Sequence, residues 1–237
     1  MESKNKFYYT IQYQDLDATR SLRLYTLENY LLNSAGRAAD ELGFGMHCLS
    51  ADNLTWVLIN LALEVDYLPT EGEVLEVETW IENQVHMLSF RNFRLSVNGK
   101  QIGQAKSSWT VINYIDRTIQ NIFDRPVFGV VTPGEKLSIE QRRHIPSVDE
   151  PAGQWEHQIV YSDIDYNGHC NSCKYLEFML NAVECPYLPL RLDIKYAKEV
   201  RKGDKIRVLY SQTAETTCYE VRTETGELSC SAAIVQC

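Results

Sequence analysis

Two stretches of the chain have the period of an amphipathic helix, and each is followed by segments that alternate like strands. Apolar and small side chains recur at helical spacing over 27–42 and again over 175–183. Downstream, apolar and charged residues alternate over 74–82 and 205–210, as in strands with one face on a core. The pattern predicts that each long helix covers the apolar face of an antiparallel sheet.

The second half of the chain repeats the first. Tyr-Gln-Asp-Leu-Asp at 13–17 matches Tyr-Ser-Asp-Ile-Asp at 161–165, and each run leads into a predicted helix. Later, the stretch 61–77 matches 192–208, and an Asn-Gly turn at 98–99 matches Thr-Gly at 225–226. Three matches in the same order indicate two copies of one unit. Chance self-similarity within a single large α+β domain is the alternative.

The repeat predicts an α+β chain with a tandem (double) hot-dog fold, in which each half is a long helix wrapped by an antiparallel sheet. The expected domains are an N-terminal hot-dog over 1–130 and a C-terminal hot-dog over 155–237. The segment 131–154, with three prolines and mixed charge, is expected to be the linker. The length of 237 residues agrees with two domains of about 120 residues each.

Composition narrows the class of protein. The chain has 23 Lys+Arg and 32 Asp+Glu, a net charge of −9, and 44% hydrophobic residues, which is ordinary globular composition. The negative charge argues against nucleic acid as a partner. No apolar run is long enough for a signal peptide or a membrane span, so we expect a cytoplasmic protein.

The cysteines predict neither a disulfide framework nor a metal site. There are seven, an odd number in a chain of this size, which is typical of a reduced protein. Cys170 and Cys173 form a C-x-x-C, but no second Cys/His pair follows at ligand spacing. We therefore expect no metal and no redox cofactor, and interpret the pair as small residues near a helix start.

The two copies differ where chemistry is expected. Before the second helix stand Asp165, Asn167 and His169, a carboxylate, a carboxamide and an imidazole within five residues, whereas the first copy keeps only the acid. Downstream, Glu199 occupies the position of Leu68 in the first copy, which makes it a candidate general base. The structural alternative is helix capping for the loop residues and a solvated surface acid for Glu199.

The residues also resemble a known family. The run 163–171, Asp-Ile-Asp-Tyr-Asn-Gly-His-Cys-Asn, resembles the D-x-D-x-N-x-H-x-N signature of the acyl-ACP thioesterases. The first half adds similar tracts at 53–57, 67–74, 79–80 and 105–111. These are double hot-dog enzymes of plants and bacteria that end fatty-acid synthesis. Because the plastid transit peptide has no counterpart here, the resemblance suggests a bacterial, cytoplasmic member.

The resemblance implies hydrolysis of an acyl thioester to a free fatty acid and the carrier's thiol, without a cofactor. Asn167 would hold the substrate carbonyl or the attacking group, and His169 would orient a water or a carboxylate. Glu199 would be the general base, and Asp165 would either orient the network or act as nucleophile. The family was also described with an Asn-His-Cys triad, but this chain has Val200 at the cysteine position.

The expected partner is an acyl carrier protein with a phosphopantetheine-linked acyl chain. That carrier is acidic, and the stretch 191–207 is rich in bases, so Lys198, Arg201 and Lys202 are candidates for its docking. Ordinary solvated strand faces are the alternative. We expect a monomer or a homodimer, with neither nucleic acid nor a membrane as a partner.

Three apolar residues of the first copy are candidates for the acyl pocket. Trp56, Leu58 and Trp80 are expected to lie inside the half that has lost the candidate catalytic residues. The alternative is that each is an ordinary core residue. Two rival functions also stand: an acyl-CoA thioesterase of the same fold, and a non-catalytic acyl-binding or regulatory protein.

Overall fold

The computed structural model describes residues 4–121, 131–183 and 188–237. The chain divides into two compact units, which we describe one at a time. Unit 1 comprises 1–59 and 67–140, and unit 2 comprises 60–66 and 141–237. The division at 140–141 lies inside the predicted linker.

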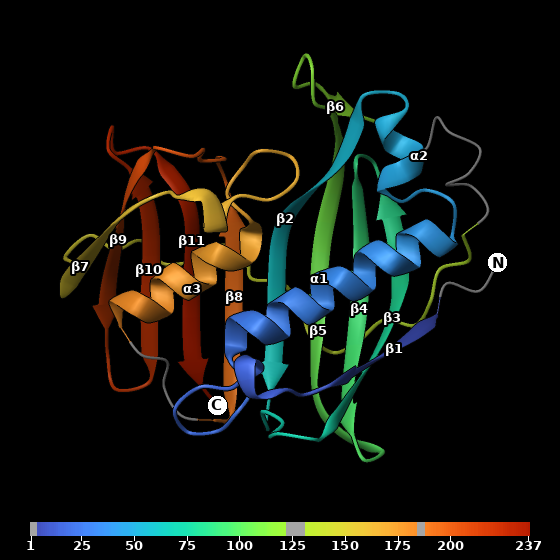
Figure 1. The fold of residues 1–237 in the computed structure, drawn as a ribbon, viewed down its shortest axis with the longest axis horizontal. Coiled ribbons are helices and arrows are strands. Elements are labelled where there is room, and N and C mark those ends of the chain that lie inside the picture. Colours follow the sequence, from blue (N-terminus) through green and yellow to red (C-terminus); the bar gives the residue numbers. More distant parts are fainter. Residues whose placement is uncertain (1–3, 122–130, 184–187) are drawn as a thin grey trace. The chain divides into compact units, whose positions relative to one another are not determined.

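Unit 1 is a sheet with one long helix on its face (Figure 1). The strands lie in the order β1-β3-β4-β5-β2, and β6 pairs with β5. A short helix, α2, occupies the connection between α1 and β2. The bounds of the elements are β1 (Asn5–Thr10), a 3-10 turn (Tyr13–Asp15), α1 (Leu24–Glu41), α2 (Met46–Ser50), β2 (Leu54–Val65), β3 (Val74–Val85), β4 (Leu88–Val97), β5 (Lys100–Asn113) and β6 (Ile119–Gln120).

The core of unit 1 lies between α1 and the sheet. Leu27 and Leu31 of α1 are completely buried, and α1 packs on β3 and β1 of the sheet and on α2. On β3, Leu75 and Val77 are buried at alternate positions, as the strand period requires. The helix ends before Gly43, whose φ of 81° is the left-handed conformation that glycine adopts readily at a helix end.

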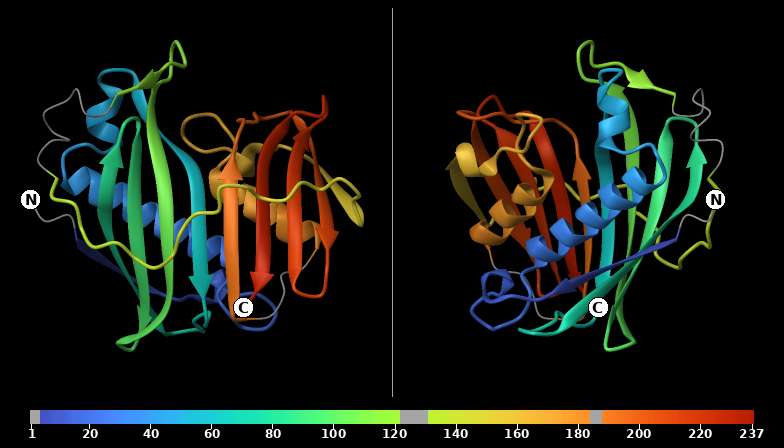
Figure 2. Two further views of the ribbon diagram at one scale, coloured as in Figure 1. Left: turned by 180° about the vertical axis from the view of Figure 1, so that it is seen from behind. Right: turned by 45° about the vertical axis from the view of Figure 1, so that its right-hand side comes forward.

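Unit 2 repeats this arrangement with a shorter helix. Its strands lie in the order β8-β11-β10-β9-β7 and are antiparallel, and residues 60–65 of β2 pair with β8. Figure 2 shows α3 on one face of this sheet. The bounds are β7 (Gly153–Gln158), a 3-10 turn (Tyr161–Asp163), α3 (Ser172–Ala182), β8 (Leu190–Tyr196), β9 (Lys205–Gln212), β10 (Thr216–Thr223) and β11 (Leu228–Gln236).

The hydrogen bonds around each helix start also repeat. Leu22 N donates to Pro69 O at 2.8 Å in unit 1, and Cys170 N donates to Val200 O at 2.9 Å in unit 2. These pairs occupy the positions that the sequence matches assign to each other. The predicted fold class, α+β with a helix on an antiparallel sheet in each half, is confirmed.

The segment 131–152 contains neither a helix nor an extended strand, and it packs on the outer faces of the sheets. In unit 1, Trp80 Nε1 donates to Glu135 O at 2.7 Å. In unit 2, Ile145 and Val148 form a buried cluster with Cys218 and Ala233. The outer faces are therefore partly covered, although strand alternation alone predicts polar, solvated faces. In the described part of the chain, no helix has the length and apolar character needed to cross a bilayer.

Candidate active site

The loop before α3 is closed by its own backbone. Asp165 N donates to His169 O at 2.8 Å, and Gly168 N donates to Asp165 O at 3.1 Å. Gly168 has a φ of 79°, in the left-handed region where glycine carries little strain. An isolated bridge between Ile164 and Cys170 closes the base of the loop. Side chains between these two residues are therefore presented on a fixed turn.

The Asp165 side chain accepts hydrogen bonds from the backbone of its own loop. Its Oδ1 accepts hydrogen bonds from Asn167 N at 2.8 Å and from His169 N at 3.3 Å. In unit 1, Asp17 Oδ1 accepts in the same way from the amides of Thr19 and Ser21, at 2.8 and 3.2 Å. Because the copy without the amide and imidazole has the same bonds, these contacts organise the loop whether or not chemistry occurs there.

The structure brings His169 and Glu199 together. His169 Nε2 lies 3.1 Å from Glu199 Oε2, and the two side chains are 17% and 32% exposed. The pair is therefore partly sheltered from water and still accessible to a substrate. In unit 1 the corresponding residues are Ser21 and Leu68, which cannot form such a pair. An imidazole and a carboxylate in contact can accept and hold a proton.

Glu199 lies in the connection between β8 and β9, which is anchored on both sides of it. Cys170 N donates to Val200 O at 2.9 Å, and Val200 is completely buried. On the other side, the Tyr175 hydroxyl of α3 donates to Lys198 O at 3.4 Å. The sequence showed these residues only as neighbours in the chain. The structure shows that α3 and the loop before it hold the backbone on both sides of Glu199 in place.

Asn167 and Asn171 have different roles. Asn167 is exposed at the tip of the loop, where its carboxamide faces solvent. Asn171 is the N-cap of α3, and its Oδ1 accepts from Cys173 N at 3.0 Å. Because Asn171 satisfies this free amide of the helix start, Asn167 is the better placed of the two to contact a ligand.

The C-x-x-C pair is buried. Cys170 and Cys173 are each 7% exposed. Burial, followed by the nearby carboxylates of Asp163 and Asp165, raises the pKa of Cys170 to about 12. Among the residues that the structure describes, no group of three His, Cys, Asp or Glu side chains is arranged to hold a metal ion.

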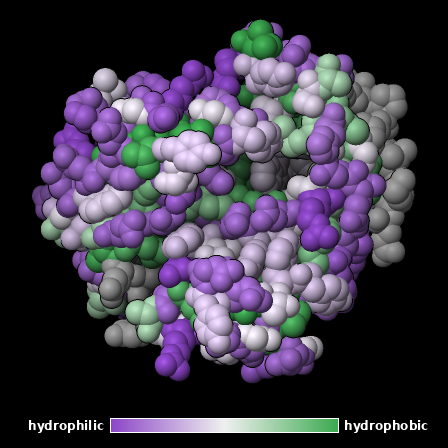
Figure 3. Space-filling view, viewed as in Figure 1, coloured by the Kyte–Doolittle hydropathy of each residue, from purple (hydrophilic) through white to green (hydrophobic). Residues whose placement is uncertain are grey.

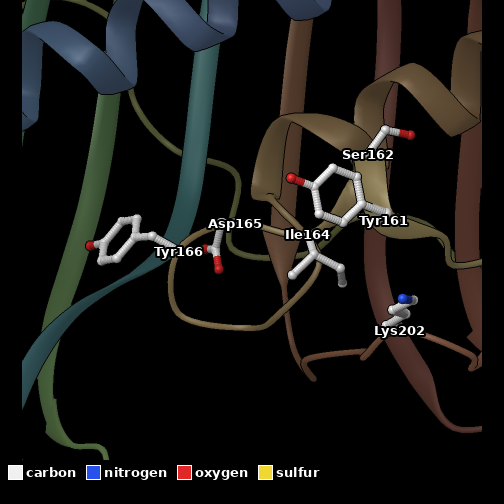
Figure 4. Close-up of a pocket in the computed structure, with 6 residues that line it drawn as sticks. All are labelled: Tyr161, Ser162, Ile164, Asp165, Tyr166 and Lys202. Carbon is white, nitrogen blue, oxygen red and sulfur yellow. The ribbon is translucent and has the colours of Figure 1, made fainter.

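A cavity of about 480 Å³ lies beside the loop, where sequence analysis predicted none (Figure 4). Tyr161 and Tyr166 are 84% and 76% exposed, and the picture shows Tyr166 and Lys202 at opposite ends of the cavity. Tyr161 could have been found from the repeat, because Tyr13 holds the same position and is also exposed. The cavity is lined by Tyr161, Ser162, Ile164, Asp165, Tyr166 and Lys202.

The three candidate docking bases do not carry equal free charge. Lys198 Nζ forms an ion pair with Glu227 Oε2 at 2.5 Å. Arg201 and Lys202 are exposed in the turn before β9, and no ion pair to either is found among the described residues. The positive charge available to a partner is therefore concentrated at Arg201 and Lys202.

The three candidate acyl-pocket residues lie on two different faces of the sheet. Trp56 packs against a buried cluster that includes Leu54 of β2 and Ile81 of β3, on the side of the helices. Leu58, also on β2, is buried. Trp80, adjacent to Ile81, points to the opposite face, where its ring lies under Glu135. The structure therefore separates Trp80 from Trp56.

Comparisons with known proteins cover nearly the whole chain. Residues 2–127 match the family model described as acyl-ACP thioesterase N-terminal domain, and residues 149–235 match the acyl-ACP thioesterase C-terminal domain. A solved acyl-ACP thioesterase from Bacteroides thetaiotaomicron VPI-5482 is similar at a TM-score of 0.87 and 30% identity, covering 98% of this chain and 97% of that one.

More distant relatives come from plants. The chain is 26% identical over 229 residues to a chloroplastic palmitoyl-acyl carrier protein thioesterase of Arabidopsis thaliana, covering 89% of this chain and 55% of that protein. A 12:0-ACP thioesterase from Umbellularia californica has a TM-score of 0.86 at 18% identity, covering 98% and 96% of the two chains, which shows the shared fold. The chain spans little more than half the length of the Arabidopsis relative.

Proposed function

The chain belongs to the acyl-ACP thioesterase family, and on that premise we propose that it hydrolyses fatty acyl-ACP thioesters to a free fatty acid and the carrier. The observation that carries the proposal is the 3.1 Å contact between His169 Nε2 and Glu199 Oε2. It joins two positions at which unit 2 has an ionisable side chain where unit 1 has Ser21 and Leu68. A purely structural repeat has no need of either change.

Glu199 is proposed as the general base and His169 as the group that orients it. A water between the Glu199 carboxylate and the thioester carbonyl gives its proton to that carboxylate as it attacks, and the C–S bond then breaks as the carrier's thiolate takes this proton from Glu199. His169 stabilises the carboxylate through Nε2 and limits its rotation. The Asn167 carboxamide, exposed at the loop tip, donates to the carbonyl oxygen as negative charge develops there. Val200 supplies no nucleophile, and the route needs no thiolate.

Asp165 is proposed as a positioning residue. Its Oδ1 already accepts two backbone N–H groups, one of which belongs to His169. These two bonds fix the orientation of the carboxylate relative to the loop and to His169, which supports a positioning role. Of the two roles that the sequence leaves open, the structure thus favours orientation of the network. The same bonds at Asp17 support this choice.

The acyl chain and the carrier are assigned to separate features. We propose that the helix-facing side of unit 1, with Trp56, receives the acyl chain. Arg201 and Lys202, together with Lys198 despite its ion pair, are proposed to attract the acidic carrier protein. The cavity beside Lys202 offers its pantetheine arm a wall of two tyrosines.

The cellular setting is part of the proposal. The similarity to the Bacteroides structure along almost the full length of both chains supports a bacterial protein that acts in the cytoplasm. Acyl-CoA is the rival donor, because the same basic residues would suit the phosphates of coenzyme A. No observation among the described residues favours it over the carrier.

The test is a hydrolysis assay with both donor classes. Acyl-ACPs of varied length are compared with the matching acyl-CoAs, using the wild type and the His169→Ala variant. Ser21→Ala is the matched control, because Ser21 occupies the position of His169 in unit 1. We expect turnover of acyl-ACP that His169→Ala reduces at least about 100-fold and Ser21→Ala leaves unchanged. If neither donor is hydrolysed, the proposed enzyme activity is refuted. If His169→Ala and Ser21→Ala lose the same amount of activity, the proposed active site is refuted.

A further inference from the structure

Unit 1 contains a buried arginine that the proposed chemistry does not use. Arg91 lies on β4 and is only 4% exposed. Arginine is among the residues least often buried without a partner, because moving a guanidinium out of water is costly. What surrounds Arg91 therefore decides whether it is a structural or a binding residue.

Strand register places Arg91 on the side of the sheet that faces the helices. Arg91 lies directly opposite Ile81 of β3, and residues directly opposite each other in a ladder share a face. Ile81 belongs to the buried cluster with Ala39 and Leu42 of α1 and its C-terminal end. Arg91 therefore points to the same interior as Trp56, which packs on that cluster.

Few described groups of the protein stabilise the buried charge of this guanidinium. Among the described residues, one hydrogen bond from it is found, Nη1 to Thr79 Oγ1 at 3.3 Å, and no carboxylate forms an ion pair with it. Burial lowers the pKa of Arg91 to about 10, so the side chain still carries its charge at neutral pH. A guanidinium has five N–H donors, and most of them here have no acceptor among the described residues.

The other face of the same sheet shows how this protein treats a buried cation that is only structural. Lys106 of β5 is similarly buried, but its Nζ lies 2.9 Å from Glu82 Oε1. Asn92 Nδ2 donates to the second oxygen of Glu82 at 2.9 Å. That cation is fully compensated by a buried carboxylate. Arg91, on the helix-facing side, forms no ion pair with any carboxylate that the structure describes.

Further hydrogen-bonding groups lie around Arg91 on its face. Gln84 of β3 is opposite Ser89 of β4, two residues from Arg91, and Gln84 Nε2 is buried without a partner. Ser107 of β5 is opposite Arg91, and its Oγ accepts from Trp109 Nε1 at 2.7 Å. Arg91 and Gln84 thus offer uncommitted N–H donors on one small area of the sheet.

The polar area formed by Arg91 and Gln84 lies next to the apolar cluster on which Trp56 packs. The buried residues of that cluster include Leu54, Ile81 and Val111. Figure 3 shows the surface of this face hollowed beside α1, over the sheet of unit 1. A ligand here meets apolar side chains along most of its length and uncommitted donors at one place.

We propose that Arg91 and Gln84 form a polar subsite within unit 1 that binds an oxygen acceptor carried by the acyl chain, away from its thioester. The ligand class is an acyl chain with a hydroxyl, keto or carboxylate oxygen, which share the lone pairs that a guanidinium recognises. The proposal rests on the proposed function in one respect, that unit 1 receives the acyl chain.

The test measures binding without hydrolysis. S-alkyl pantetheine thioethers of one chain length, ending in a methyl, hydroxyl, keto or carboxylate group, are titrated into the full chain by calorimetry. We expect the best oxygenated analogue to bind at least about tenfold more tightly than the methyl analogue, because hydrogen bonds to a charged group are strong. The Arg91→Met variant should lose this preference. Arg94→Met, on the opposite face of β4 and paired with Glu78, should retain it.

A second measurement separates binding from folding. Arg91→Met should unfold at the same or a higher temperature than the wild type, since it removes a buried charge that lacks a counter-ion. Equal or tighter binding of the methyl analogue by the wild type would overturn the proposal, as would a preference that survives in Arg91→Met, or no binding of any analogue. Because the thioethers are not hydrolysed, the proposed enzyme activity is tested separately on acyl-ACP.

Discussion

Asp165 offers a sharp test, because Asp17 makes equivalent bonds in unit 1. Replacing Asp165 by Ala removes its acceptor bonds to two backbone N–H groups, at 2.8 and 3.3 Å. Hydrogen bonds to a charged group contribute roughly 1.5–3 kcal/mol each, and partial exposure reduces this to a total of about 1–2 kcal/mol. For a chain of this size we expect the melting temperature to fall by about 3–6 °C.

The same substitution in unit 1 provides the control. Asp17→Ala removes bonds from the same two kinds of backbone N–H group, at 2.8 and 3.2 Å, and a third from Thr19 Oγ1 at 2.7 Å, so its melting temperature should fall by at least as much. Only Asp165→Ala should also lower kcat for acyl-ACP, because only that loop carries Asn167 and His169. The two variants therefore separate loss of stability from loss of catalytic geometry, using calorimetry and a hydrolysis assay on the same samples.

Asp165→Asn decides between positioning and nucleophilic roles. Asparagine keeps an Oδ1 acceptor and is favoured in the same turn, so the loop retains its shape. We expect kcat within about tenfold of the wild type, the loss corresponding to about 1.4 kcal/mol of weaker acceptor strength. An asparagine cannot replace a carboxylate nucleophile. If Asp165→Asn loses as much activity as the loss of Glu199 causes, the positioning role is wrong.

Three further outcomes follow from burial and charge. Because the pKa of Cys170 is raised to about 12, iodoacetamide at pH 8 should leave that thiol unmodified in the folded protein, as measured by mass spectrometry. Arg201→Glu with Lys202→Glu should raise KM for acyl-ACP several-fold at low salt and less at high salt, with kcat unchanged. Trp56→Phe should change the relative rates of hydrolysis among acyl chain lengths. Trp80→Phe loses the hydrogen bond from Nε1 to Glu135 O, so it should only lower the melting temperature, by about 2–6 °C.

The fold could be predicted in considerable detail because each half has its own periodic signals. The helical period over 27–42 and the strand period over 74–82 describe buried faces directly, and the repeat supplied each pattern twice. The covering segment 131–152 could not be placed, because a proline-rich stretch has no period that indicates which surface it contacts. The position of Trp80 was missed for that reason, since its partner Glu135 lies in this segment.

The site could be predicted in part. Divergence between copies singled out His169 and Glu199, which the structure places in contact, although their separation in sequence gives no distance. The role of Asp165 was left open because its acceptor bonds to backbone depend on the turn's dihedral angles. Lys198 was grouped with Arg201 because its partner Glu227 is remote in the chain.

Arg91 shows the opposite limit. Its alternation with Phe93 and Leu95 already indicates the apolar face of a strand. Whether a described carboxylate pairs with it depends on every element around it, and no local pattern in the sequence carries that information. The contrast lies between the two faces of the sheet, because Lys106 on the other face forms an ion pair with the buried Glu82 carboxylate.

The central claim is that Glu199, held by His169, is the base for thioester hydrolysis. It is tested most directly by kcat/KM for acyl-ACP in the wild type and in Glu199→Gln, which keeps the size and hydrogen-bonding capacity of the side chain. We predict a loss of about 10²–10⁴-fold with an unchanged melting temperature. Retention of activity within about threefold, a difference of less than about 1 kcal/mol in the barrier, would contradict the account.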